Sequence, residues 1–230
     1  MGKKIIGFVF AAFSLIASDN VLAQANTVYI DQVGNNSTID VTQTGANNVI
    51  GTSASGTRLY GNSQNVTISQ IGSNNIAALN IQGNNATVDS AVTGSLNTVT
   101  INCGAGTGTL ASCADSTIAV NATGDSNTLS VTAGAKNNAT INVTGDTNNA
   151  NINSQTNNLL GAKSDVTVAG GLNSITIAQN GAAGANGFDT KVDVSGSSNI
   201  IGITQSGSVD SIVNIKSVGS NNTFTISSGN

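Results

Sequence analysis

Apolar and polar residues alternate along almost the whole chain, in short segments that each end in an Asn- or Gly-rich corner. Within a segment, apolar residues stand at positions i and i+2, and Thr, Ser or Asn fill the positions between them. A period of two with β-branched residues predicts strands that bury one face. We find no stretch with a helical period. The apolar pairs are Val28/Ile30, Ile39/Val41, Val66/Ile68, Ile118/Val120, Leu129/Val131, Ile141/Val143, Ile175/Ile177, Val192/Val194, Ile201/Ile203 and Phe224/Ile226.

The corners recur about every eleven residues, as in the stretch QIGSNNIAALNIQGNNATV from Gln70 to Val88. Gly and Asn tolerate positive φ, and Asn also bonds its own backbone at a turn. The absence of Pro fits strands that donate hydrogen bonds to neighbours on both sides. Two such units form one lap of strand, turn, strand and turn.

Laps of constant length that stack form a β-solenoid, in which each repeat buries its apolar face only against its neighbours. We therefore predict an all-β fold, a β-solenoid with two strands per lap, about 22 residues per lap, about eight laps and Asn/Gly corners. A sandwich or barrel of hairpins is the alternative fold. It also gives alternation and turns, but it does not require nearly identical corners at nearly constant spacing.

Four interruptions break this rhythm, near residues 52–65, 103–116, 154–165 and 180–190. Counted from Val28, they follow the third, seventh, eleventh and thirteenth predicted strands. Connections after odd-numbered strands lie along one edge of a two-strand lap. We therefore expect all four insertions to project from the same edge and the other edge to keep uniformly tight turns.

The first 25 residues have the features of a secretory signal peptide. A short basic start precedes an apolar stretch over residues 5–17, and small-residue motifs end at Ala23 and Ala25. The alternative, a membrane anchor, would need a longer apolar span. We expect residues 1–25 to be cleaved, residues 26–230 to form a single domain, and the mature chain to contain no transmembrane segment.

Charge is sparse and acidic, at 8% charged residues with a formal net charge of -4. The basic residues after the signal segment are scattered, whereas nucleic-acid binding needs clustered Lys and Arg. This composition argues against nucleic acid as a partner.

The chain has two cysteines, Cys103 and Cys113, in the sequence NCGAGTGTLASCADS. An exported chain meets an oxidising compartment, which favours a disulfide that closes a local loop. Two free thiols are the alternative. A metal site is disfavoured, because the chain has no His and the spacing is not that of a zinc site. We expect the disulfide to be dispensable for the fold.

We find no set of residues suited to catalysis. Without His or Glu, the Ser-His-Asp and Cys-His arrangements are impossible. Asp189 and Asp193 are close in sequence, but Asp at turns usually bonds the backbone. The segment AGGLN at 169–173 does not continue into a calcium repeat, and GAGTGT at 104–109 lacks the Lys of a phosphate loop. We predict no enzymatic activity, no cofactor and no metal site.

The stretch QIGSNNIA matches the curlin-repeat pattern Gln-x-Gly-x-x-Asn-x-Ala through Gln70, Gly72, Asn75 and Ala77. Other segments match parts of the pattern and lack the rest, as at Ser37 and Ile39, which replace its Asn and Ala. The partial matches are Gln32 and Gly34, Gln43 with Gly45 and Asn48, Gln179 with Gly181, and Gln205 with Gly207. The match is good over about residues 27–90, partial over 174–226 and faint between them. The chain thus resembles curlins, the subunits of extracellular curli fibres.

The resemblance implies a structural subunit, major, minor or nucleating, of a secreted curli-like amyloid fibre for adhesion and biofilm matrix. It implies self-association, or association with other curlin-type subunits, through the end strands, and export through an outer-membrane secretion apparatus. Inward Gln side chains would form amide ladders between laps. The alternative is a monomeric secreted β-solenoid, such as an adhesin or an ice-binding protein with a Thr-rich face.

Overall fold

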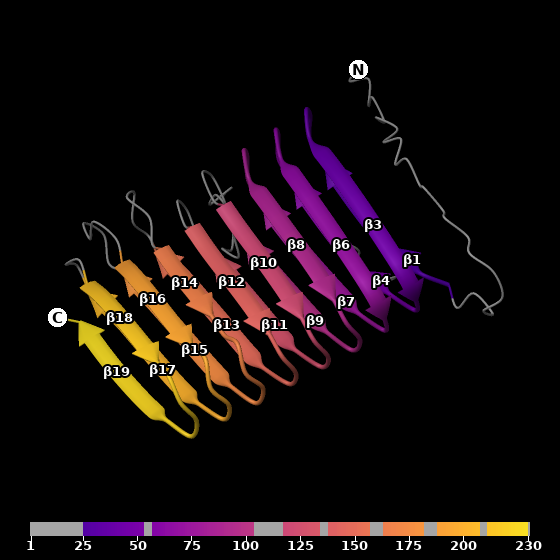
Figure 1. Ribbon diagram of the computed structural model, residues 1–230. Helices are drawn as coiled ribbons and strands as arrows, with labels where there is room; N and C mark the ends of the chain where they lie inside the picture. The colour runs from indigo at the N-terminus through magenta and orange to yellow at the C-terminus, as the bar shows by residue number, and fades with distance from the viewer. Residues whose placement is uncertain are drawn as a thin grey trace, which may run out of the picture.

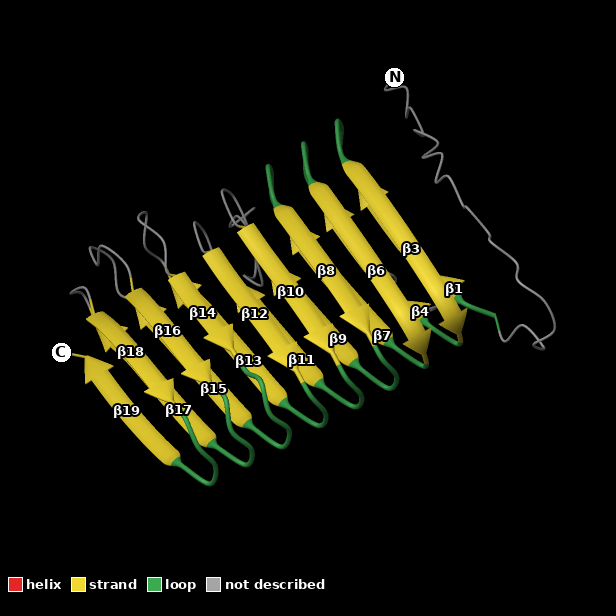
Figure 2. Cartoon of the chain, viewed as in Figure 1, coloured by secondary structure: helices red, strands yellow, loops and turns green. Residues whose placement is uncertain are grey.

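The computed structural model describes residues 25–52, 57–103, 117–133, 138–156, 163–181, 188–207 and 211–229, and all the regular structure in them is β (Figure 2). Sheet 1 contains β1 (Thr27–Val28), β2 (Ile30–Val33), β4 (Val49–Ile50), β5 (Thr57–Tyr60), β7 (Ile76–Gln82), β9 (Thr98–Cys103), β11 (Thr128–Ala133), β13 (Asn149–Thr156), β15 (Ser174–Gly181), β17 (Ile200–Gly207) and β19 (Thr223–Gly229). Sheet 2 contains β3 (Thr38–Ala46), β6 (Asn65–Ser73), β8 (Thr87–Thr93), β10 (Thr117–Thr123), β12 (Asn138–Thr144), β14 (Lys163–Thr167), β16 (Phe188–Val194) and β18 (Ser211–Ser217).

Apart from the steps β1–β2 and β4–β5, which stay in sheet 1, the chain passes from one sheet to the other after every strand and winds into a stack (Figure 1). Each strand pairs in parallel with the equivalent strand one lap away, for example β7 with β9 and β6 with β8. This confirms the predicted β-solenoid with two strands per lap. The hairpin alternative is wrong for the described strands, because hairpins pair antiparallel and all pairings in these sheets are parallel.

The laps differ in length while the strands stay in register. Equivalent Asn residues of successive laps are 21 residues apart at the closest and 30 at the widest. Sheet 2 has eight strands and the hydrogen-bonded path of sheet 1 has nine, and the corner asparagines are about 24.5 residues apart on average, so the predicted lap of about 22 residues is too short. At about 4.8 Å per strand, the stack is roughly 43 Å long in sheet 1. Extra residues are therefore accommodated between strands and do not shift the stacking.

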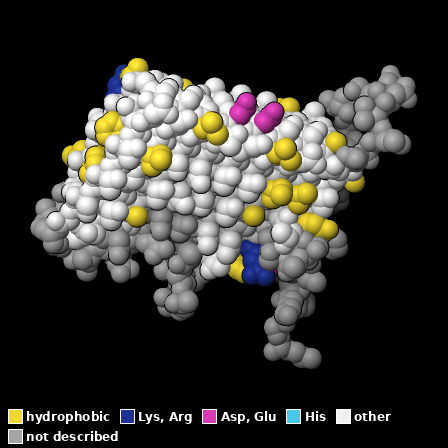
Figure 3. Space-filling view, turned by 90° about the horizontal axis from the view of Figure 1, so that it is seen from below, with side chains coloured by type: hydrophobic (Ala, Val, Ile, Leu, Met, Phe, Trp, Pro, Cys, Tyr) yellow, Lys and Arg dark blue, Asp and Glu magenta, His cyan; other side chains and the backbone are white. Residues whose placement is uncertain are grey.

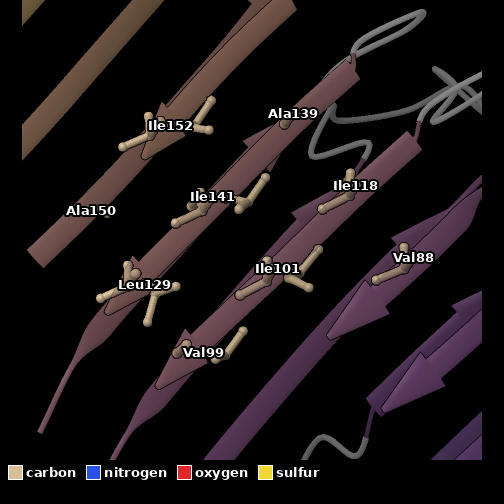
Figure 4. Packing of buried hydrophobic residues seen from close by; sticks show 14 of the residues in the cluster. Val88, Val99, Ile101, Ile118, Leu129, Ala139, Ile141, Ala150 and Ile152 are labelled. Atoms are coloured by element: carbon tan, nitrogen blue, oxygen red, sulfur yellow. The ribbon is translucent and has the colours of Figure 1, made fainter. Parts of the chain in front are cut away.

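The core lies between the two sheets and is built from the predicted alternation. Sheet 1 sends the row Val99, Leu129 and Ala150 inward, and sheet 2 sends in Val88, Ile118 and Ala139 (Figure 4). Side chains in these rows are at most 1% exposed. Because each row repeats along the stack, every lap buries its apolar residues against the laps before and after it.

The two edges of the stack differ. The connections from sheet 2 to sheet 1 are short turns at every lap, and we call their edge the Asn edge. The segments outside the described residues, other than those at the termini and residues 53–56, connect sheet 1 to sheet 2. These connections include the expected insertions near 103–116, 154–165 and 180–190.

The insertion expected at 52–65 differs from this prediction. Thr57–Tyr60 is a strand, β5, which pairs with β2 and β7, and residues 61–64 form a further corner. The extra residues come between β4 and β5, which both pair with β7 in sheet 1, so they do not connect the two sheets. The predicted signal peptide lies outside the described residues except for Ala25. In the described ranges, no helix is long and apolar enough to span a membrane.

Candidate functional site

Every turn on the Asn edge has the sequence Gly-x-x-Asn. The corners are Gly45–Asn48, Gly72–Asn75, Gly94–Asn97, Gly124–Asn127, Gly145–Asn148, Gly170–Asn173, Gly196–Asn199 and Gly219–Asn222. The residue before each corner Asn is left-handed, with φ between 56° and 61°. Six of the eight glycines also have positive φ. The third residue of the corner reverses the chain and aims the Asn side chain inward.

The corner glycines stack directly on one another along the edge. A Cβ added to Gly72 would overlap the carbonyl oxygen of Gly94, and a Cβ on Gly45 would overlap that of Gly72. The opposite edge has the same arrangement for Gly34, Gly61 and Gly83. Laps stacked at strand spacing thus leave no room for a side chain at these positions, which explains why the pattern requires glycine.

The corner asparagines form one continuous ladder through the molecule. In each step the backbone N–H and Nδ2 of one Asn donate to Oδ1 of the Asn one lap earlier, at 2.9–3.1 Å and 3.0–3.2 Å. The members are Asn26, Asn48, Asn75, Asn97, Asn127, Asn148, Asn173, Asn199 and Asn222. The seven inner members are at most 1% exposed.

The ladder has a direction. Donors point toward the N-terminal end of the stack and acceptors toward its C-terminal end. Several of the Nδ2 groups bond a corner carbonyl as well, as Asn75 does with Gly94 O at 2.7 Å. At the last described rung, no hydrogen bond to the Oδ1 of Asn222 is found among the described residues. The C-terminal end of the ladder can therefore accept a further Asn.

The predicted Gln positions lie in two short ladders at opposite ends of the stack. Gln43 Nε2 donates to Gln70 Oε1 at 2.8 Å in sheet 2, where Val92 occupies the next position. In sheet 1, Gln179 Nε2 donates to Gln205 Oε1 at 3.0 Å. The sequence suggested ladders of this kind, and the structure places these four side chains in single steps only.

Gln179 and Gln205 belong to a wider buried polar network near the C-terminal end. Ser164 Oγ donates to Gln179 Oε1 at 2.5 Å, and Thr190 Oγ1 donates to Gln205 Oε1. Gln205 Nε2 donates to Ser211 O at 2.7 Å. Gln205 therefore stabilises its own laps, in addition to any contact it makes beyond them.

The remaining predicted repeat residues have separate places. Gln32 is half-buried and its Nε2 donates to Gly34 O at 3.1 Å, so it bonds its own corner. Ala77 is fully buried between Ile50 and Val99. Gly181 pairs with Gly207, where the two strands β15 and β17 end.

Cys103 is disulfide-bonded and fully buried. Its expected partner, Cys113, lies outside the described residues. The sequence placed Cys103 in an insertion, but Cys103 is the last residue of β9 and fills an inward position between Ile81 and Ala133. One of the two cysteines of the predicted disulfide, Cys103, therefore lies in the core of the solenoid.

The two ends of the stack expose the core. The inward apolar residues of β1, β2, β3 and β19 are only partly buried, whereas the same rows inside the stack are almost completely buried. The partly buried residues are Val28, Ile30, Ile39, Val41, Phe224 and Ile226. Among the described residues, no strand or helix covers β1, β2 and β3 at one end or β19 at the other.

The charged side chains of the described residues lie mostly on the outer surface. Among the described residues, no three His, Cys, Asp or Glu side chains are grouped as metal ligands. Asp189 and Asp193 lie on the same face of β16, with Lys191 between them. Seen from the Asn edge, hydrophobic and charged side chains are dispersed over a mostly uncharged surface (Figure 3).

Sequence reasoning missed seven of the nine ladder residues, namely Asn26, Asn97, Asn127, Asn148, Asn173, Asn199 and Asn222. An Asn-Asn pair does not identify these corners, because the pair is absent at several of them. The recurring feature is Gly three residues before Asn, as in GSLN, GDSN, GDTN and GSSN. The segment AGGLN, considered for calcium, contains one of these corners.

Comparison with known proteins gives one family match. Residues 23–45 match the family model described as the curlin associated repeat. This range covers β1, β2 and most of β3, with Gln32, Gly34, Gln43 and Gly45 in it. No curated protein and no solved structure matches the chain. The chain therefore carries a curlin-associated repeat in the first lap of its solenoid.

Proposed function

We propose that this protein is a structural subunit of an extracellular, curli-like amyloid fibre that serves adhesion and biofilm matrix. The observation that carries the proposal is the pair of open ends, where partly buried core residues and the Asn ladder both stop. An exposed strand edge with an apolar inner face favours addition of another strand. The curlin-associated repeat in the first lap supports the same function.

The partner at each end is a second copy joined C-terminal end to N-terminal end. Continuing the register of the stack lays Phe224 over Val28 and Ile226 over Ile30 of the next copy. Asn222 Oδ1 then accepts from the next copy's Asn26, so the ladder continues with its direction preserved. Each side chain that goes from half to full burial contributes about 1 kcal/mol.

The outward side chains of the two ends fit the same junction. Tyr29, at 40% exposed, and Val33, at 59%, lie outward on the first rung. The last rungs carry small outward residues at the matching positions, Thr225 and Gly229. Bulky side chains of one copy thus cover small ones of the next.

An ice-binding protein would need a flat array of Thr, and the described strands do not form one. The outward Thr residues are divided between two faces, with Thr67, Thr140 and Thr167 on sheet 2 and Thr100, Thr176 and Thr225 on sheet 1. Thr67 lies between Asp40 and Asp89 of the neighbouring strands, so charged residues interrupt this row of Thr. A monomeric adhesin remains as the second candidate, and the state of association separates it from the fibre subunit.

The fibre function carries further proposals on location and partners. The protein is secreted through an outer-membrane apparatus to the cell surface, and the fibre contains this chain alone or with other curlin-type subunits. The long connections and the short Gln ladders suit a minor or nucleating subunit. The role is structural, without a catalytic step.

The test is fibre growth by the mature protein with one end blocked. Ile226→Asp places a carboxylate where the junction has to be apolar, and burial without a partner is costly. Thr225→Asp makes the same change one residue away, on the outward face. We expect the Ile226→Asp variant to lose growth, measured by a cross-β dye and electron microscopy, and the Thr225→Asp variant to keep most of it. Wild-type protein that stays monomeric for days at tens of micromolar and does not seed on curlin-type fibres would refute the fibre.

A further inference from the structure

The outer face of sheet 2 carries a concentrated set of charges at its C-terminal end. Six charged residues face outward there, Lys163 and Asp165 on β14, Asp189, Lys191 and Asp193 on β16, and Lys216 on β18. Over β3 to β12, the described outward positions of the same face hold two, Asp40 and Asp89. We call the six residues the charge lattice.

The signs alternate in both directions across the lattice. Along β16 they run negative, positive, negative at Asp189, Lys191 and Asp193. Between strands, the register sets Lys163 beside Asp189 and Asp165 beside Lys191. Asp193 lies beside Lys216 in the same way. Nearest neighbours therefore have opposite charge throughout.

Four of the six lattice residues form no ion pair with described residues of the same molecule. In the described part of the chain, Lys216 and Asp193 form an ion pair at 3.9 Å. Lys163, Asp165, Asp189 and Lys191 form no ion pair with described residues, and all but the half-buried Asp165 are exposed. These four line a shallow hollow of about 270 Å³ together with Asn138, Thr140 and Ser164.

We propose that the charge lattice binds the charge lattice of a second copy of this chain, face to face and with the two stacks antiparallel. A two-fold axis parallel to the strands, between β14 and β16, places Lys163 opposite the second copy's Asp189. The same axis places Asp165 opposite the second copy's Lys191. Both contacts occur twice, and no two like charges of the lattice meet.

The contact joins fibres side by side, and in this form it rests on the proposed fibre. One exposed ion pair contributes about 0.2–1 kcal/mol, so two isolated molecules associate weakly. In a fibre the lattice recurs once per chain, about every 43 Å, and the contacts of two neighbouring fibres act together. Because the pairs are exposed, salt screens them. Fibres bundle at low ionic strength and separate at high ionic strength.

The first experiment compares charge reversals at matched positions. Asp165→Lys and Lys191→Asp each oppose like charges across the two-fold axis, whereas Asp89→Lys makes the same change as the first outside the lattice, in the same outward row of sheet 2. We expect electron microscopy at low salt to show at least a fivefold loss of bundled fibres for each lattice variant. Asp89→Lys keeps bundling within about twofold, and dye-monitored growth is similar in all three.

The decisive experiment mixes preformed fibres of the Asp165→Lys and Lys191→Asp variants. Under the two-fold axis, the two lysines of one partner then face the two aspartates of the other, so bundles return. In a mixture of Asp89→Lys with Lys191→Asp fibres, which has the same net charges, the Asp89→Lys fibres bundle with one another and labelled Lys191→Asp fibres stay outside the bundles. Fibres that form normally but bundle alike in every variant, or mixtures that fail to recover, overturn the lattice contact and leave the fibre in place.

Failure of the fibre itself gives a different result. If wild-type protein forms no fibres, the lattice still predicts a weak dimer of the monomer, measured by sedimentation velocity at low salt. This dimer is absent for each single variant and present in the mixture of the two. A monomer at all concentrations and salts refutes the lattice contact independently.

Discussion

The corner asparagines combine two tasks that elsewhere need two residues. Each side chain accepts from a backbone N–H of the next lap and donates to the lap before, at positions that water does not reach. A buried backbone N–H without an acceptor costs about 1–3 kcal/mol, so the turn needs the acceptor that the ladder provides.

Asn127→Ala tests the ladder inside the stack. The substitution removes the acceptor of the Asn148 backbone N–H and Nδ2. We expect the free energy of unfolding to fall by about 2–4 kcal/mol, measured by urea denaturation in an Ile226→Asp background that keeps the protein monomeric. Asn121→Ala removes an exposed acceptor of Asn142 and serves as the control, with a change below about 0.5 kcal/mol. Equal effects of the two would contradict a structural ladder.

Thr147 occupies the left-handed position of its corner, with φ 57°. A β-branched residue is strained there, while Asn at Asn47, Asn74 and Asn221 is not. We expect Thr147→Asn to raise the free energy of unfolding by about 1 kcal/mol. Thr123→Asn, in strand β10, is the matched control and lowers stability slightly, because Asn is disfavoured in strands. A loss of stability at Thr147 would show that its hydroxyl or methyl group has a role the corner geometry does not explain.

At the scale of the element, strands could be predicted well and corners less well. Alternation fixed the inward residues, as in β7 and β12, because one buried face demands period two. Strand β5 was missed, since its sequence TRLY stands in a Gly- and Ser-rich stretch and pairs only through laps distant in sequence. Cys103 was assigned to a loop because the Gly-rich residues after it concealed the end of β9.

The first position of each corner tolerates substitution least, because most corner glycines contact the next lap directly. Gly72→Ala would place a Cβ against the carbonyl of Gly94 at φ 119°. We expect at least about 3 kcal/mol of lost stability or failure to fold, followed by circular dichroism during urea unfolding. Gly202→Ala, in strand β17, has open space around the added Cβ and is the control, with no loss. A tolerated Gly72→Ala would contradict stacking of the corners at strand spacing.

At the scale of the whole molecule, the sequence predicted the solenoid and its two strands per lap, because a repeated corner leaves few ways to bury the repeated faces. It could not place the charge lattice. The charges of the lattice are far apart along the chain, and only the register of β14, β16 and β18 brings them together. The two Gln ladders likewise depend on which laps are neighbours.

The central claim is that chains stack end to end, each adding a whole solenoid to the fibre. Mass per unit length, measured by scanning transmission electron microscopy on single unbundled fibres, tests it most directly. One chain of 22.7 kDa, or about 20 kDa without residues 1–25, would occupy nine strand spacings of sheet 1, roughly 43 Å. The account predicts about 0.5 kDa per Å, together with the strand spacing of about 4.8 Å along the fibre axis. A value near 4 kDa per Å, as for an amyloid in which each chain contributes one layer, would contradict it.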